Sequence, residues 1–429
     1  MKYRISKLIY TAGAAALLLG MGSCKKDYTD PSSVPSDQAF TTSQTLTAVA
    51  TGLQRTYTAG RASSLFNRIT LDGLLTNQYT VINQGNIAEY QLGQGGGTVD
   101  GTNTILGGLW TSSNKIIYDA DQVIAGAAGL GDRGYASGLV AYATIMKALA
   151  LGDLAMYWEK VPAGIGERVT FVDRADAYTR AIAAINAAQA GIAATPITAG
   201  FLANIPSGID IPNTLNALKA RYSLFLGNYS EALAAANAVD LTKRSVFSFN
   251  TVNLNPVFET STSTNNVVSA AANFGLPAGL QPDPNDRRIR FYQTAAYASR
   301  IAGFDSAAAS ARPIYLPGEI TLIKAEAYAR MTPPDLANAL IELNKVITKQ
   351  PSADPFGVGA GLPPVVLTTQ QAILDEIYRQ RSIELALSGL RLEDMRRFNR
   401  PLTERKRNFL PYPFLERDNN PNTPADPAF

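Results

Sequence analysis

The chain has 429 residues, of which 46% are hydrophobic and 17% are charged, as in a globular protein with two or three domains or one large helical array. It has no histidine and one cysteine, which excludes internal disulfides, Ser-His-Asp and Cys-His nucleophile systems and histidine-based metal sites. The formal net charge is +3, but Lys2, Arg4 and Lys7 alone account for it, because residues 1–23 contain no acid. The rest of the chain is neutral, which argues against a nucleic-acid partner.

Residues 1–23 have the pattern of a signal peptide. Basic residues precede an apolar stretch, residues 8–21, that is short for a membrane-spanning helix. Gly22, Ser23 and Cys24 follow and resemble a bacterial lipobox. We therefore expect Cys24 to be the lipidated first residue of the mature protein, anchored by several acyl chains. Residues 24–38 include a polar stretch rich in proline and serine, which predicts a linker.

Two helices are expected next. The first runs from a cap at Ser36 or Asp37 to about Tyr57, and the second spans about residues 62–75. Residues 76–104 then lose helical periodicity and carry amides, tyrosines and a cluster of glycines. No Gly-Lys-Ser/Thr follows the glycines, so they do not form a phosphate loop. We predict a long loop-rich insertion, a kind of segment that is usually functional or disordered.

Helical patterns resume at residues 106–124 and at about 135–158. An alanine-rich pair of helix hairpins follows at residues 174–240, in which residues 216–236 look like a tetratricopeptide unit. A related helix pair recurs at residues 319–347. The sequence therefore predicts a mostly α fold, in which stacked tetratricopeptide-like helix pairs form a helical layer.

Residues 241–312 interrupt the helical pattern again. Serine, threonine, asparagine and proline dominate, with phenylalanines and tyrosines scattered among them. We predict a second loop-rich insertion that packs on the helical layer. Trp110 and Trp158, by contrast, lie in apolar helical runs, so we expect them to pack in the core rather than bind a ligand.

Residues 369–399 concentrate charge within an apolar helical frame. Thr369 is a plausible helix N-cap, and Gly389 is expected to end that helix before a second short one begins. The charges allow three interpretations: a solvated face with ion pairs, a charge-paired brace between two helices, or, least favoured, catalytic use of Glu384 and Asp394. We favour the brace, because the ligand-like residues lie in distant loops.

The same stretch resembles a known family. Its pattern is Arg381-x-x-Glu384-Leu385-x-x-x-Gly389-x-Arg391-x-x-Asp394-x-Arg396-Arg397, similar to the C-terminal signature of the SusD/RagB nutrient-binding lipoproteins. The chain departs from it at Ser388, where the family usually has Glu, and at Leu392 and Phe398, where it favours Trp. Residues 147–162 and 410–422 also resemble family segments. The resemblance implies a SusD-like helical domain formed by residues 39–240 and 313–429, with the loop-rich insertions packed on it.

What the resemblance implies is a non-catalytic lipoprotein on the outer face of the outer membrane, attached to lipid through Cys24. It would capture an oligosaccharide or a peptide and deliver it to a SusC-like TonB-dependent transporter, without a metal or cofactor. Two other classes stay open. One is a tetratricopeptide-like scaffold for envelope assembly, which the long insertions disfavour. The other is a secreted glycan hydrolase with a carboxylate pair, which is less favoured.

Candidate ligand contacts are sought among aromatic rings and planar amides, because sugar rings stack on the former and hydrogen-bond to the latter. The first insertion supplies Asn77, Gln78, Tyr79, Asn83, Gln84, Asn86 and Tyr90, and the second supplies the weaker candidates Phe274, Tyr292 and Tyr297. The alternative for each tyrosine is half-buried packing within a loop.

Overall fold

The computed structural model describes residues 40–263 and 267–429. The expected signal peptide, Cys24, the linker and the helix cap at Ser36 or Asp37 lie outside the described residues. In the described part the first helix begins at Ser43, and its N-cap is Thr42, whose hydroxyl accepts a hydrogen bond from the Thr45 N–H at 3.2 Å.

The elements follow one another in three groups. The first group contains α2 (Ser43–Thr58), α3 (Ser64–Leu75), β1 (Tyr79–Val81), α4 (Ile87–Gln94), η1 (Gly96–Thr98), α5 (Thr104–Ala127), α6 (Arg133–Tyr157), β2 (Lys160–Pro162), β3 (Phe171–Asp173), α7 (Ala175–Ala194), α8 (Ala199–Leu202), α9 (Ile211–Phe225) and α10 (Tyr229–Asn237). The second contains β4 (Val246–Phe247), η2 (Phe258–Ser263), β5 (Val268–Ala270), η3 (Ala272–Gly275), α11 (Arg287–Tyr292), η4 (Gly303–Asp305) and β6 (Arg312–Pro313). The third contains α12 (Pro317–Arg330), α13 (Leu336–Thr348), η5 (Pro351–Ala353), α14 (Gln370–Glu384), α15 (Arg391–Arg397), η6 (Leu402–Glu404) and α16 (Phe414–Asn419).

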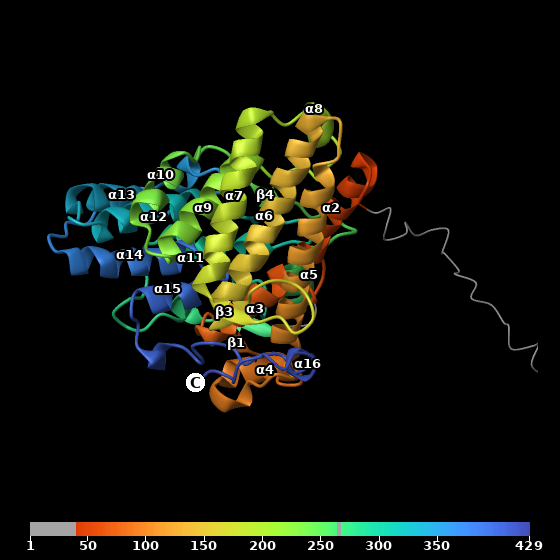
Figure 1. The fold of residues 1–429 in the computed structure, drawn as a ribbon. Helices are drawn as coiled ribbons and strands as arrows, with labels where there is room; N and C mark the ends of the chain where they lie inside the picture. The colour runs from red at the N-terminus through yellow and green to blue at the C-terminus, as the bar shows by residue number, and fades with distance from the viewer. Residues whose placement is uncertain (1–39, 264–266) are drawn as a thin grey trace, which may run out of the picture. The chain divides into compact units, whose positions relative to one another are not determined.

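The helices form a continuous layer, and the predicted mostly α fold is confirmed. α2, α5, α6 and α7 lie side by side (Figure 1), and α6 packs on both α5 and α7. The layer continues through α9, α10, α12, α13 and α14, each in contact with a neighbour in this series. The strands of the described residues are short and form three antiparallel pairs, β1 with β5, β2 with β3 and β4 with β6.

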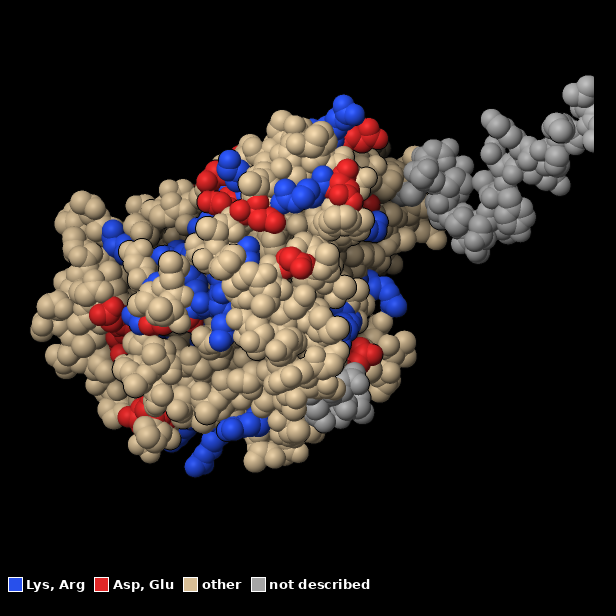
Figure 2. Space-filling model, turned by 90° about the horizontal axis from the view of Figure 1, so that it is seen from below, with Lys and Arg blue, Asp and Glu red and all other residues tan. Residues whose placement is uncertain are grey.

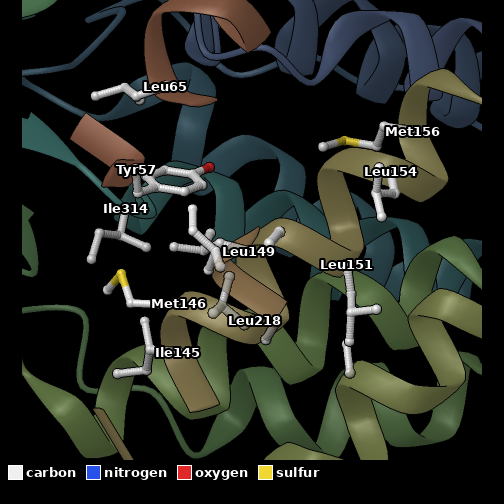
Figure 3. Close-up of a cluster of buried hydrophobic side chains, with 14 of the residues drawn as sticks. Tyr57, Leu65, Ile145, Met146, Leu149, Leu151, Leu154, Met156, Leu218 and Ile314 are labelled. Atoms are coloured by element: carbon white, nitrogen blue, oxygen red, sulfur yellow. The ribbon is translucent and has the colours of Figure 1, made fainter. Parts of the chain in front are cut away.

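The centre of the layer is α6. Among the described residues it is the one helix whose length and hydropathy would suit a membrane span, but most of its side chains are buried inside the protein. Figure 3 shows Met146 and Leu149 of α6 facing Tyr57 of α2 and Leu218 of α9. Helix α9 approaches α6 closely at Gly152, where a Cβ atom would lie 2.3 Å from the hydroxyl oxygen of Tyr222.

The two tryptophans pack in the core, as predicted. Their ring centroids lie 4.9 Å apart in an edge-to-face arrangement. The Trp158 indole N–H donates to the carbonyl oxygen of Pro411 at 3.0 Å, and that of Trp110 donates to Glu416 at 3.1 Å. These bonds attach the C-terminal segment to α5 and α6.

The prediction that residues 76–104 lack a helix was wrong. They contain β1, the eight-residue helix α4 and the turn η1. Helix α4 buries little more than Glu89 and Leu92 and exposes Ile87, so it has no apolar stripe that a sequence pattern could reveal. The described residues between 241 and 312 do contain only short elements, the longest being α11 and η2 with six residues each.

Candidate functional site

The signature residues of α14 and α15 are buried and paired inside the protein. Arg381 and Glu384 are fully buried, which excludes the solvated-face interpretation. The Arg381 Nε donates to the Asp394 carboxylate at 2.9 Å, and Arg397 donates to the same carboxylate and to Glu326 of α12. Burial alone would raise the pKa of Asp394, but the charges of Arg381 and Arg397 outweigh it and hold that pKa below its usual value.

Glu384 belongs to a second part of the same lattice. It does not pair with Arg381, its neighbour on the helix. Its carboxylate accepts from the Arg288 guanidinium of α11 at 3.0 Å and from the Lys349 ammonium at 2.7 Å. Both cations hold it from inside the protein, so it connects α14 to the second insertion and to the segment after α13.

Arg391 does not pair with Asp394. Its guanidinium donates to two backbone carbonyl oxygens, those of Phe274 and Ser382. The backbone N–H groups of Arg391 and Leu392, at the start of α15, donate to the Asp72 carboxylate of α3 at 3.3 and 2.8 Å. Burial raises the pKa of Asp72, although these N–H donors oppose the shift.

Arg396 and Gly389 complete the signature. The Arg396 guanidinium donates to Glu393 at 2.6 Å and to the carbonyl oxygen of Met156 at 2.9 Å, which ties α15 to the end of α6. The expected helix end at Gly389 was wrong, because α14 ends at Glu384. Gly389 has φ +80° and lies against Arg68, whose Cγ would be 2.7 Å from an added Cβ, so this position requires glycine for a close approach. We name the buried charges of α14 and α15 with their partners the brace.

Four of the ligand candidates lie in the interior. The Gln78 amide donates to Asp72 and Thr76 and accepts from the Leu387 N–H, all at 2.8–2.9 Å. The Tyr292 hydroxyl donates to the carbonyl oxygen of Glu384 at 2.6 Å. Tyr79 and Phe274 are only 4% and 3% exposed. These four side chains stabilise the fold and do not face solvent.

The other candidates from the first insertion lie at or near the surface. Asn83, Gln84 and Tyr90 are exposed, and Asn77 and Asn86 are half-buried. The Asn77 amide donates to the carbonyl oxygen of Glu404 at 2.8 Å, so its role in the fold is at least partly structural. The other four surround the turn that leads into α4.

Tyr297 comes from the second insertion and is also exposed. Its loop lies beside β5, because the Ala270 N–H donates to the carbonyl oxygen of Ser299 at 2.8 Å. β5 in turn pairs with β1, where Ala270 lies opposite Tyr79. The fold therefore brings the two insertions together at this sheet.

An exposed apolar surface adjoins these residues, and sequence reasoning missed it. It consists of Ile87 and Tyr90 of α4, Phe414 and Leu415 of α16, and Phe429. The Phe429 ring lies against Gly96 and Gly97, the Phe414 N–H donates to the carbonyl oxygen of Gly101, and the Lys406 N–H to that of Leu75. We name this surface, with the turn before α4, the α4–α16 face.

The figures show the same surface from two sides. α4, α16 and the C-terminus lie together at the lower edge of Figure 1, and Figure 2 views the protein from below, where uncharged residues separate scattered groups of charged ones. Large exposed apolar side chains such as Leu415, 70% exposed, and Phe429, 75% exposed, are unusual when they cluster. The apolar residues come from two regions far apart in the chain, residues 87–90 and 414–429, so only the fold reveals that they lie near each other.

Comparison with known proteins identifies both a family region and a fold. The sequence model of the SusD family matches residues 306–426. No curated protein matches the chain. Among solved structures, the chain is similar to a SusD superfamily protein from Parabacteroides distasonis, with a TM-score of 0.68 and 15% identity over 92% of this chain and 100% of that one.

Two structures from Bacteroides fragilis are similar as well. A SusD superfamily protein gives a TM-score of 0.67 at 16% identity, covering 90% of this chain and 99% of that one. A protein described as a SusD-like carbohydrate-binding protein gives a TM-score of 0.61 at 15% identity, covering 84% of this chain and 87% of that one. At such identities the likeness demonstrates a shared fold.

Proposed function

Because residues 306–426 match the SusD family model and the chain shares its fold with SusD superfamily structures, we propose that it is a member of the SusD/RagB family and a non-catalytic lipoprotein of the outer membrane that binds an oligosaccharide and delivers it to a SusC-like TonB-dependent transporter. The observation that carries this proposal is the family match over residues 306–426 within a fold shared over nine-tenths of the chain. The carbohydrate-binding description of one structural relative supports a glycan as the ligand.

The α4–α16 face is our proposed ligand surface. Asn83, Gln84 and Asn86 offer amide donors and acceptors at the turn before α4, and Tyr90 and Tyr297 offer partly exposed rings. Amides that hydrogen-bond to hydroxyl groups and rings that stack on the CH-rich face of a sugar are the groups that an oligosaccharide requires. The buried candidates Gln78, Tyr79, Phe274 and Tyr292 are not part of this proposal.

The same face is our proposed surface for the transporter. Exposed clusters of large apolar side chains are typical of protein–protein contacts, and here they lie next to the proposed ligand contacts. A ligand bound at this face would therefore lie at the boundary between the two proteins. Lipid attachment through Cys24 and exposure at the cell surface remain predictions from the sequence.

The brace argues against the hydrolase alternative. Glu384 and Asp394 are the two carboxylates that the sequence suggested for catalytic use. Each of them forms ion pairs with two cationic side chains inside the protein. A general acid or base must reach its substrate and exchange a proton with it. Carboxylates fixed in this way are better suited to joining helices.

Glycan binding can be tested by affinity gel electrophoresis of the full chain against a panel of polysaccharides. We expect retardation by at least one glycan, and a loss of about 5- to 30-fold in affinity in Tyr90→Ala, since stacking on a ring contributes about 1–2 kcal/mol. Tyr118→Ala is the matched control, because Tyr118 is an exposed tyrosine of α5. Equal loss in both variants, or retardation by none of the glycans, would contradict the proposed site.

Transporter binding can be tested by co-purification from detergent-solubilised membranes. We expect a TonB-dependent barrel to accompany the wild-type chain and to be lost in the double variant Ile87→Glu, Leu415→Glu. Ile341→Glu on α13 is the control, because Ile341 is exposed to a similar degree but lies outside this face. If no such barrel accompanies the wild-type chain, the delivery role is wrong.

A further inference from the structure

A polar groove lies outside the α4–α16 face. It runs between α2 and two loop segments, residues 206–207 and residues 248–254, and its volume is about 520 Å³. Hydroxyl and amide side chains dominate the lining: Thr51, Gln54, Thr58, Ser207, Ser248, Asn250 and Asn253. A volume of this size lies within the range of small-molecule binding sites.

The groove is open above the middle of α2. A Cβ atom added at Gly52 would meet no atom within 4 Å, so no side chain covers this part of the helix. On the opposite wall the loop is held in one conformation by Asn250, whose side-chain oxygen accepts from the N–H groups of Val252 and Asn253, both at 2.8 Å. The groove thus has one wall that is a helix and another that is a well-fixed loop.

Arg55 is the one charged residue among those that line the groove. Its Nη1 donates to the side-chain oxygen of Asn253 at 2.8 Å, across the groove from α2 to the loop. This amide orients the guanidinium but leaves its charge uncompensated, and no carboxylate of the described residues forms an ion pair with Arg55. The arginines of the brace, in contrast, contact carboxylates or backbone carbonyls in the interior.

A guanidinium with free N–H groups binds a carboxylate in a geometry that neutral ligands cannot match. The hydroxyl and amide groups around it suit sugar hydroxyls, and Phe249 adds a partly buried ring. We propose that this groove is a second saccharide subsite, which binds the carboxylate-bearing unit of an acidic glycan through Arg55. The inference rests on the proposed glycan-binding function and adds to it a preferred ligand charge and a second place of contact.

The test compares two probes by isothermal titration calorimetry on the detergent-solubilised full chain. One probe is an oligogalacturonide, and the other is the same oligosaccharide with its carboxyl groups reduced to alcohols. We expect the acidic probe to bind at least tenfold tighter, and Arg55→Met, which keeps much of the side-chain length, to remove this preference. Because the charge is at the surface, raising the salt concentration should reduce the preference as well.

A second pair of variants tests whether the acidic probe binds in this groove. Gly52→Trp should fill the groove and lower the affinity for the acidic probe at least tenfold. Gly191→Trp on α7 is the matched control, because a Cβ there also meets no atom within 4 Å. Thermal unfolding of each variant verifies that it is folded.

The outcomes separate the inference from the function on which it rests. Equal binding of both probes, or an unchanged preference in Arg55→Met, would overturn the acidic subsite while leaving a glycan-binding protein. Loss of affinity in Gly191→Trp equal to that in Gly52→Trp would overturn the proposed place. Failure of both probes and of every glycan in the panel would overturn the subsite and the proposed function together.

Discussion

The brace and the α4–α16 face differ in what they do with polar residues. The brace contains charged side chains that are buried and paired, such as Arg381 with Asp394. The α4–α16 face exposes apolar side chains such as Leu415, and its charged residues, such as Arg417, lie at the surface. In this protein a concentration of charge in the sequence therefore marks the interior, and the surface proposed to bind ligand and partner is marked by amides and apolar groups.

If this contrast is correct, breaking the brace should reduce stability and leave ligand binding intact. We expect Asp394→Ala to lower the free energy of unfolding by about 3–5 kcal/mol, because it leaves Arg381 and Arg397 buried without this carboxylate. Denaturant unfolding measures the loss, and titration of the folded fraction measures glycan affinity. Arg379→Ala, whose partner Glu376 is also near the surface, should cost about 1 kcal/mol or less. Equal losses in the two variants would contradict a buried lattice.

Stability should also depend on pH through Asp153 of α6. Burial raises the pKa of this carboxyl to about 6, although Arg68 opposes the shift. The raised pKa favours the protonated folded state, so this contribution is fully present below about pH 4 and is lost as the pH rises to about 6. Relative to Asp153→Asn, the wild-type chain should lose about 3 kcal/mol in all as the pH rises from below about 4 to well above about 6. Denaturant unfolding of both proteins across this range measures the difference, and parallel pH profiles would show that Asp153 does not titrate there.

A substitution at the close approach of α6 and α9 should reduce stability by a smaller amount. Gly152→Ala should destabilise the protein by about 1–3 kcal/mol, because the new Cβ would overlap the Tyr222 hydroxyl. Gly52→Ala in α2 is the control, since its Cβ meets nothing and alanine favours a helix, so it should be neutral or stabilising by up to about 1 kcal/mol. The melting temperature should fall in Gly152→Ala and stay the same or rise in Gly52→Ala. Equal melting temperatures in the two variants would contradict the close approach.

The smallest effect on stability is expected at the α4–α16 face. Tyr90→Ala removes a partly exposed ring, so the free energy of unfolding should change by about 0.5 kcal/mol or less. The same variant should show the loss of glycan affinity described above. A Tyr90 variant that unfolds easily and binds normally would reverse the contrast between the two regions.

The helical fold could be predicted because helix formation leaves local signals. Thr369 was expected to cap a helix, and its hydroxyl does accept the Ala372 N–H at 3.2 Å. The packing of Trp158 followed in the same way from the apolar run around it. Helix α4 was missed because its few buried residues leave no periodic pattern.

The candidate site was only partly predictable, because burial depends on contacts between distant segments. Gln78 and Asn83 have similar side chains in one short stretch, yet Gln78 is buried by its bonds to Asp72 and Leu387 and Asn83 is exposed. No local pattern separates the two. The apolar part of the α4–α16 face is equally non-local, since the Phe429 ring meets Gly96 and Gly97, just after α4, only in the folded chain.

The bond between Asp72 and the start of α15 has a consequence for the order of events during biosynthesis. The N–H groups that donate to the buried Asp72 carboxylate lie 319 and 320 residues further along the chain. A ribosome must therefore finish most of the polypeptide before α3 can acquire its final surroundings. The native surroundings of α3 are therefore completed only after the C-terminal part of the chain has been synthesised.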